Sequence, residues 1–142
     1  MEQKRVVVTG LGLVAPVGLD VESGWQNILA GRSGIKPITH FDIEPFSMRF
    51  GGPIYDFDVE QYIPKKEAKK MDTFTHYALA AAEQAIGHSG LDHDNSDPTR
   101  VGVIVGAGIG GMQTMIDGHH QLLAKGPRGL SPFFIPAIIA NI

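Results

Sequence analysis

The stretch VGVIVGAGIGG, residues 101–111, carries most of the information about the fold. It is a run of valine and isoleucine, then a cluster of glycines, and a segment with a helical pattern follows it. This density of β-branched residues is typical of a strand buried on both faces, as in parallel sheets. The glycines allow the backbone to approach a ligand or another element closely. We therefore predict a central strand that ends in a functional turn.

Strand-like and helix-like segments alternate along the chain, which predicts an α/β fold. Besides the central strand, the predicted elements are a buried strand over 5–17, short strands and loops over 34–62, and helices over 21–30, 64–70, 72–89 and 112–125. The helix limits rest on capping signals, with Asp20 as an N-cap and with Gly31 and Gly90 after the last helical residues. A final apolar element is expected to begin near Ser131, with Pro132 in its first helical position.

Composition narrows the class of protein. The 142 residues are enough for one domain with a core, and a net charge of −3 argues against a nucleic-acid-binding protein. The chain has no cysteine, which excludes disulfides, thiolate metal sites and a cysteine nucleophile within it. The N-terminus shows neither a signal peptide nor a membrane span. The chain ends in the apolar run PFFIPAIIANI, so we expect it to be the front portion of a longer protein.

The glycines also fit a dinucleotide-binding fingerprint. Two stretches match: Gly10, Gly12 and Ala15 after the first strand, and Gly106, Gly108 and Gly111 after the central one. The first is followed by Pro16, which disfavours a helical turn there. The second opens a helix, but no acidic residue follows Asp117 to bind a ribose, and only Arg128 offers a partner for a 2′-phosphate. Tight packing of strand against helix is the simpler use of both stretches.

Neither a metal site nor a hydrolase site is indicated. No histidine pair has the i, i+4 spacing of a helical zinc site, and no G-x-S-x-G motif surrounds a serine. Asp56 and Asp58 lie in a loop and are interpreted as turn formers. The six histidines are His40, His76, His88, His93, His119 and His120. We predict no metal and no cofactor.

Four lysines lie within six positions of an otherwise acidic chain: Lys65, Lys66, Lys69 and Lys70. A solvated helix face would account for such a run. The functional alternative is a docking site for an acidic partner, with charge steering the encounter.

With these segments placed, the sequence resembles the β-ketoacyl-acyl carrier protein synthases, and among them the type II elongating enzymes of bacterial fatty acid synthesis. Five blocks carry the resemblance: VVVTGLGLVAPVG (6–18), WQNILAGRSGI (25–35), KKMDTFTHYALAAA (69–82), residues 101–111, and GPRGLSPFFIPAIIAN (126–141). They occur in the family's order and cover essentially the whole chain. The resemblance implies a thiolase-like α/β/α/β/α fold. Residues 1–142 would be an incomplete N-terminal part of its first half, with no separate second domain.

The resemblance implies a decarboxylative Claisen condensation of an acyl thioester with malonyl-acyl carrier protein. The family uses a cysteine nucleophile and two histidines, and none of them has a counterpart in this chain. No catalytic residue is therefore assigned here, and we expect the chain to be inactive alone. His76 and His119 are not given catalytic roles.

Other functional positions of the family are present. Gly108 and Ile109 match the acyl pocket, and Phe134 matches an aromatic that reaches across a dimer interface toward the partner's pocket. The positions that match the carrier-protein site are Lys66, Lys69, Lys70 and Arg128. Gly129 replaces the basic residue typical beside Arg128, so this contact is expected to be weaker. The implied partners are acyl carrier protein and a second copy, with no nucleic acid and no membrane, in the cytoplasm.

Two alternatives stay open. One is a Rossmann-like dinucleotide-binding module that uses Gly106, Gly108 and Gly111. The other is a non-catalytic partner subunit similar to a chain-length factor. A cysteine in the nucleophile block beyond residue 142 would favour the enzyme over the partner subunit.

Overall fold

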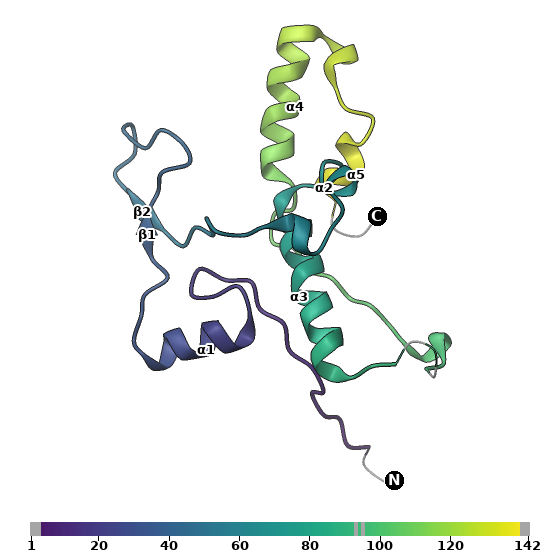
Figure 1. Cartoon of the computed structure of the whole chain (residues 1–142). Coiled ribbons are helices and arrows are strands. Elements are labelled where there is room, and N and C mark those ends of the chain that lie inside the picture. Colours follow the sequence, from purple (N-terminus) through teal and green to yellow (C-terminus); the bar gives the residue numbers. More distant parts are fainter. Residues whose placement is uncertain (1–3, 93, 95, 140–142) are drawn as a thin grey trace. The chain divides into compact units, whose positions relative to one another are not determined.

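The structure is a computed structural model that describes residues 4–92, 94 and 96–139 (Figure 1). The chain forms two compact units. The first unit comprises Met1–Asp58 and Ala81–Leu91, and the second comprises Val59–Ala80 and Asp92–Ile142. The long helix α3 (Thr73–Ser89) contributes residues to both.

Helix α1 (Val21–Leu29) of the first unit begins where the sequence predicts. The Asp20 carboxylate accepts a hydrogen bond from the Ser23 N–H at 2.8 Å, which satisfies a donor that the helix leaves unpaired. The residue that α1 buries is Gly24, against the side chain of Leu13. The apolar stripe of the helix is exposed instead, and Trp25 is 54% exposed.

The predicted strand over 5–17 is not formed. Its one ladder contact is an isolated bridge between Ala15 and Gly18. The Leu11 N–H donates to Nδ1 of His88 at 3.1 Å, and the Leu13 N–H donates to Oε1 of Gln84 at 3.0 Å. A strand is defined by hydrogen bonds to a neighbouring strand. Here helical side chains accept the bonds that a neighbouring strand would accept, so the prediction is wrong for these residues.

Short strands do occur where they were expected between residues 34 and 62. Strand β1 (Lys36–Pro37) pairs with β2 (Phe50–Gly51) in antiparallel register. The Tyr55 hydroxyl holds this hairpin by donating to the Pro37 carbonyl and by accepting from the Thr39 N–H, both at 2.9 Å.

The second unit is helical. Its elements in chain order are η1 (Val59–Gln61), α2 (Lys65–Ala68), the first turns of α3, η2 (Pro98–Arg100), α4 (Met112–Lys125), η3 (Pro127–Gly129) and α5 (Phe134–Ile138). The predicted helices over 64–70, 72–89 and 112–125 are confirmed. The last element begins at Phe134 and not at Pro132, because Ser131 first closes a turn: its side chain accepts from the Phe133 N–H and its carbonyl from the Phe134 N–H. Residues 140–142, the end of the apolar run, lie outside the described residues.

The central strand predicted within 101–111 is extended backbone without a strand partner among the described residues. Ile104 is 99% exposed and Val103 is 85% exposed. A β-branched run becomes a parallel strand only when neighbouring strands accept and donate its ladder bonds. The sheet in the described part of the chain is the two-stranded β1–β2 hairpin of the first unit, so this prediction is also wrong as a statement about these residues.

Candidate functional site

The basic segment consists of Lys65, Lys66, Lys69 and Lys70 on and just after α2. Lys65 pairs with Glu60 at 2.8 Å, and the hydrogen bond and charge of Glu60 raise the pKa of this lysine. Lys70 pairs with Glu67 at 2.7 Å. Within the described residues, Lys66 and Lys69 have no carboxylate within ion-pair distance. The unneutralised positive charge of the segment therefore lies on Lys66 and Lys69.

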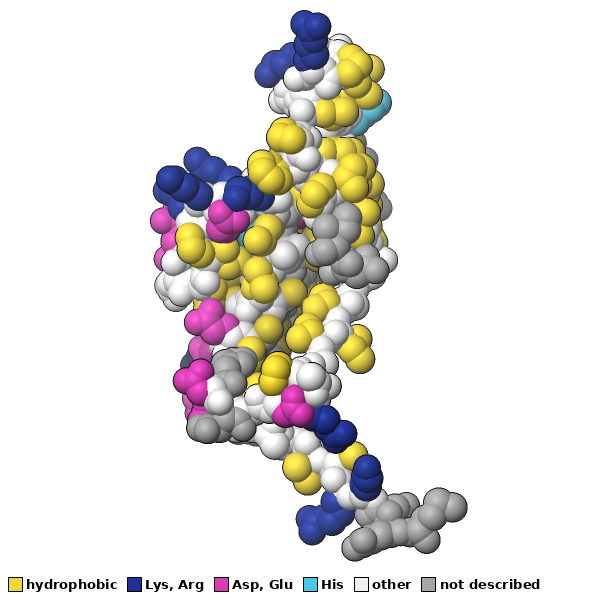
Figure 2. Space-filling view, turned by 90° about the vertical axis from the view of Figure 1, so that its right-hand side faces the viewer, with side chains coloured by type: hydrophobic (Ala, Val, Ile, Leu, Met, Phe, Trp, Pro, Cys, Tyr) yellow, Lys and Arg dark blue, Asp and Glu magenta, His cyan; other side chains and the backbone are white. Residues whose placement is uncertain are grey.

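Arg128 lies apart from the basic segment. It is exposed in η3, directly after the C-terminal end of α4. The basic segment is linked to the other end of α4 through Asp72, which bonds Thr114. A helix of 14 residues is about 20 Å long. Figure 2 shows dark-blue side chains over α2 and a separate group around the junction of α4 and η3. The predicted carrier-protein residues thus form two basic regions.

The turn of residues 106–111, called the pocket turn because the resemblance implies an acyl pocket at this place, leads directly into α4. Ile109 is 69% exposed, and a Cβ at Gly108 would meet no atom of the described residues within 4 Å. Gly110 has a φ of +80°, and the Gly111 N–H donates to the Ile138 carbonyl at 3.2 Å. The turn is therefore fixed at its end by α5 and presents an open apolar side at Ile109. Such a surface suits an apolar group, not a charged one.

Phe134 packs on α4. A Cβ at Gly118 would overlap the Phe134 ring, so the glycine makes room for the aromatic side chain. Sequence reasoning missed Gly118, although a glycine in the interior of a helix costs stability and signals a packing need. Phe134 lies in α5, and Ile109 lies in the turn before α4. The two elements meet where the Ile138 carbonyl of α5 accepts from the Gly111 N–H.

Asp72 is a second residue that sequence reasoning missed. It is the charged side chain among the described residues that is buried, with 8% exposure. Its Oδ2 accepts from the Thr114 N–H at 2.8 Å. Gly111, the N-cap of α4, has no side chain to cap the helix, so Asp72 supplies the cap from 42 positions away. The bond links the residues after the basic segment to those after the pocket turn.

This cap bears on the dinucleotide hypothesis. The fingerprint at Gly106, Gly108 and Gly111 needs the N-terminus of α4 to receive a pyrophosphate. A carboxylate already occupies that position. In the other stretch, Cβ atoms at Gly10 and Gly12 would overlap carbonyl oxygens of α3. Both arrangements favour packing over phosphate binding.

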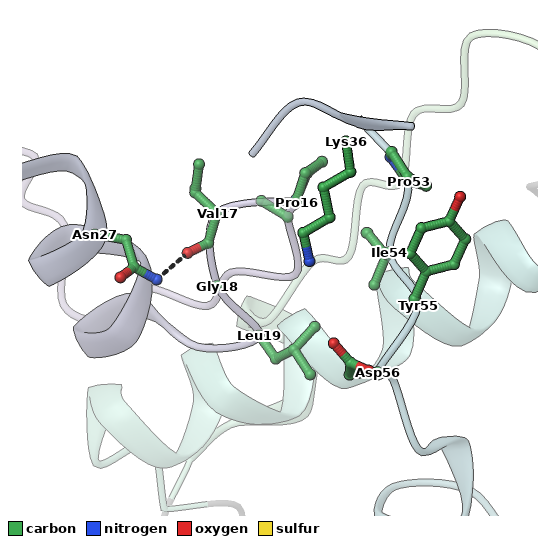
Figure 3. Close-up of a pocket in the computed structure, with 11 residues that line it drawn as sticks. Pro16, Val17, Gly18, Leu19, Asn27, Lys36, Pro53, Ile54, Tyr55 and Asp56 are labelled. Atoms are coloured by element: carbon green, nitrogen blue, oxygen red, sulfur yellow. Dashed lines mark hydrogen bonds between the residues drawn. The ribbon is translucent and has the colours of Figure 1, made fainter. Parts of the chain in front are cut away.

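The first unit contains a cavity of about 180 Å³ (Figure 3). Residues 15–19 and 53–56 form its walls, and the Lys36 side chain extends between Pro16 and Ile54. Asn27 fixes one wall by donating to the Val17 carbonyl at 2.6 Å. None of the predicted site residues lines this cavity.

Two of the histidines contact backbone groups. Nε2 of His76 lies 2.9 Å from the Ala68 carbonyl, and His88 accepts from Leu11. His93 lies outside the described residues. Across residues 4–92, 94 and 96–139, no group of three histidine, aspartate or glutamate side chains could hold a metal ion. No helix in the same residues has the length and apolar character needed to cross a bilayer.

Comparison with known sequences places the whole chain in one family. Residues 3–142 match the family described as Beta-ketoacyl synthase, N-terminal domain. The chain belongs to the β-ketoacyl synthase family. It is 51% identical over 142 residues to 3-oxoacyl-[acyl-carrier-protein] synthase 2 of Vibrio cholerae. It is 46% identical over 141 residues to the protein of the same name from Staphylococcus aureus.

The chain spans about a third of the length of these relatives. The two alignments include 100% and 99% of this chain, respectively, but only 34% of each relative. Solved structures show the same proportion. A complex of a type II PKS acyl-carrier protein with its ketosynthase (AntDE:AntF) matches 96% of the chain at a TM-score of 0.76 and 33% identity, covering 35% of that structure's chain. The ishigamide ketosynthase/chain length factor matches 94% at a TM-score of 0.76 and 31% identity, covering 34% of its chain. These neighbours confirm the thiolase-like α/β fold class.

Proposed function

We propose that the protein to which these residues belong is a 3-oxoacyl-[acyl-carrier-protein] synthase. It would condense an acyl thioester with malonyl-acyl carrier protein, with loss of CO₂. The observation that carries this proposal is the 51% identity over the whole chain to a relative of that name. Solved ketosynthases align with a TM-score of 0.76, which supports the same assignment.

Within such an enzyme, this chain would supply binding surfaces and not the reacting groups. The chain has no cysteine, so a thiolate nucleophile is not available from it. Gly108, Ile109 and Phe134 are proposed to line the acyl pocket, where each buried methylene contributes about 0.8 kcal/mol. The open apolar side of the pocket turn supports this role.

The basic segment is proposed to bind the acidic carrier protein through Lys66, Lys69 and Lys70, with Arg128 as a second contact. Lys66 and Lys69 support this, because no ion pair in the described residues neutralises them. Lys70, paired with Glu67, has less free charge. We also propose a homodimer in the cytoplasm, with no cofactor.

The experiment uses the complete protein with acyl- and malonyl-acyl carrier protein. We expect 3-oxoacyl product, and K66E/K69E should raise the KM for carrier protein on the order of tenfold, because charge steers the encounter. K36E, which reverses an exposed lysine of the first unit, is the control and should leave KM unchanged. A complete protein without condensing activity would contradict the enzyme and favour the subunit similar to a chain-length factor.

A further inference from the structure

Asp72 lies between the two proposed binding surfaces. It lies two residues after Lys70, the last lysine of the basic segment, and its carboxylate is buried against the start of α4. Its own carbonyl accepts from the Thr75 N–H at 3.0 Å, so the backbone of Asp72 also begins α3. A buried carboxylate that accepts from a backbone N–H forms a charge-assisted bond, about twice as strong as a neutral one. Asp72 therefore connects the start of α3 to the start of α4, through its carbonyl at Thr75 and its carboxylate at Thr114.

A second set of contacts also links the basic segment to the pocket turn, through α5. The ammonium of Lys70 lies 5.4 Å from the centroid of the Phe133 ring, which immediately precedes α5. The other end of α5 holds the pocket turn, because the Ile138 carbonyl accepts from the Gly111 N–H. A Cβ added at Gly111 would lie 3.1 Å from Oδ2 of Asp72, so the carboxylate also abuts the turn itself. The basic segment and the pocket turn are thus joined on two sides.

We propose that Asp72 is a positioning residue that fixes the pocket turn relative to the basic segment. This inference rests on the proposed function, since it assigns a consequence to that turn. The carboxylate holds the first turn of α4 and thereby sets where Ile109 stands. Long acyl chains that reach Ile109 depend on this position, whereas short chains do not.

The test compares wild type with D72A, D72N and D117A in the complete protein. D117A removes an exposed carboxylate from the same helix α4 and is the matched control. Amide hydrogen exchange is read at Thr114 and Gly111, and kcat/KM is measured with a long and a short acyl carrier protein. We expect D72A to lower the protection of Thr114 about tenfold or more and to lower that of Gly111 as well.

The kinetic expectation for D72A is a fall in the long-to-short ratio of kcat/KM of about fourfold, the contribution of one methylene contact. D72N keeps an acceptor oxygen and should lie between D72A and wild type in both measurements. Unchanged protection at Thr114 and Gly111 would overturn the inference. So would lost protection with an equal effect on long and short substrates.

The inference can still be tested if D72A does not fold or if the complete protein is inactive. If D72A does not fold, D72S decides: it keeps a polar group, but its hydroxyl is one bond shorter than the carboxylate that accepts from the Thr114 N–H. A D72S protein equal to wild type in exchange and in the ratio would overturn the inference. If the complete protein has no condensing activity, the proposed function fails. Exchange at Gly111 then still shows whether Asp72 holds the turn.

Discussion

Gly12 and Gly106 each follow an apolar run, and each belongs to a stretch of the G-x-G type. Their surroundings differ. A Cβ at Gly12 would overlap the carbonyl oxygen of Ala81 on α3, whereas a Cβ at Gly106 would lie more than 4 Å from the other residues that the structure describes. In the first unit glycine lets backbone lie directly on a helix, and in the second unit it leaves a turn open. The same local pattern therefore serves packing in one place and accessibility in the other.

The largest expected effect on stability comes from adding a methyl group at Gly12, in the packed stretch. Gly12→Ala places a methyl group against helix backbone, which cannot move aside like a side chain. We expect it to lower the free energy of unfolding of the protein by about 3 kcal/mol, at the upper end for overpacking. Chemical denaturation measures this loss.

Gly87→Ala is the matched control for this substitution. Gly87 lies on α3, the helix that carries Ala81, and in the described part of the chain a Cβ there meets no atom within 4 Å. Alanine at this position should stabilise the helix by about 0.5–1 kcal/mol. Equal destabilisation by the two substitutions would show that the contact with Ala81 is not the reason.

A larger side chain at Ile109, in the open turn, should change the selectivity between long and short acyl substrates and not the free energy of unfolding. Ile109→Phe enlarges an exposed side chain at the proposed acyl pocket, so a long acyl chain loses room. In the complete enzyme, we expect the kcat/KM for long acyl substrates to fall on the order of tenfold more than that for short ones. Ile109→Leu, which conserves volume, is the control. Equal losses for both substrates would count against the pocket assignment.

The helices that follow the two stretches are also capped differently. Helix α1 is capped locally by Asp20, and α4 is capped by the distant Asp72. Asp20→Ala should cost about 1 kcal/mol near neutral pH. The backbone N–H and hydroxyl of Ser23 hold the pKa of Asp20 below its ordinary value of 3.8. Its contribution is therefore present above that value and is lost as the pH falls through the lowered pKa.

Thermal unfolding of wild type and Asp20→Ala across this pH range checks the cap. The difference between the two proteins should shrink in acid. Asp20→Asn keeps a capping oxygen and should retain most of the stability without this pH dependence. A difference between the two proteins that does not shrink at all in acid would show that the charge of the carboxylate does not contribute to the cap.

The contrast in capping also explains what the sequence predicts well. The start of α1 follows from Asp20, and the ends of α1 and α3 follow from Gly31 and Gly90, which have φ values of +65° and +66°. These signals lie within a few residues of the helix ends that they set. Periodicity and capping are local, so helix limits are readable from one sequence.

Strands and long-range contacts are not local in this sense. The runs at 5–17 and 101–111 have the composition of strands, but a strand exists only when another strand pairs with it. Asp72 caps a helix 42 positions away, and no spacing rule joins it to Thr114. The basic segment was visible as lysines, but only the structure shows that Glu60 and Glu67 neutralise two of them.

The smallest effect is expected at the open glycine itself. Gly106 has no positive φ, and no neighbour among the described residues would touch its Cβ, so alanine fits without strain. Gly106→Ala should leave the free energy of unfolding within about 1 kcal/mol of wild type, with any change toward stabilisation, because alanine restricts the unfolded chain. Denaturation beside Gly12→Ala measures the difference directly. A large loss at Gly106 would mean that a part of the protein beyond the described residues packs against this turn, and the turn would then be closed as tightly as the stretch around Gly12.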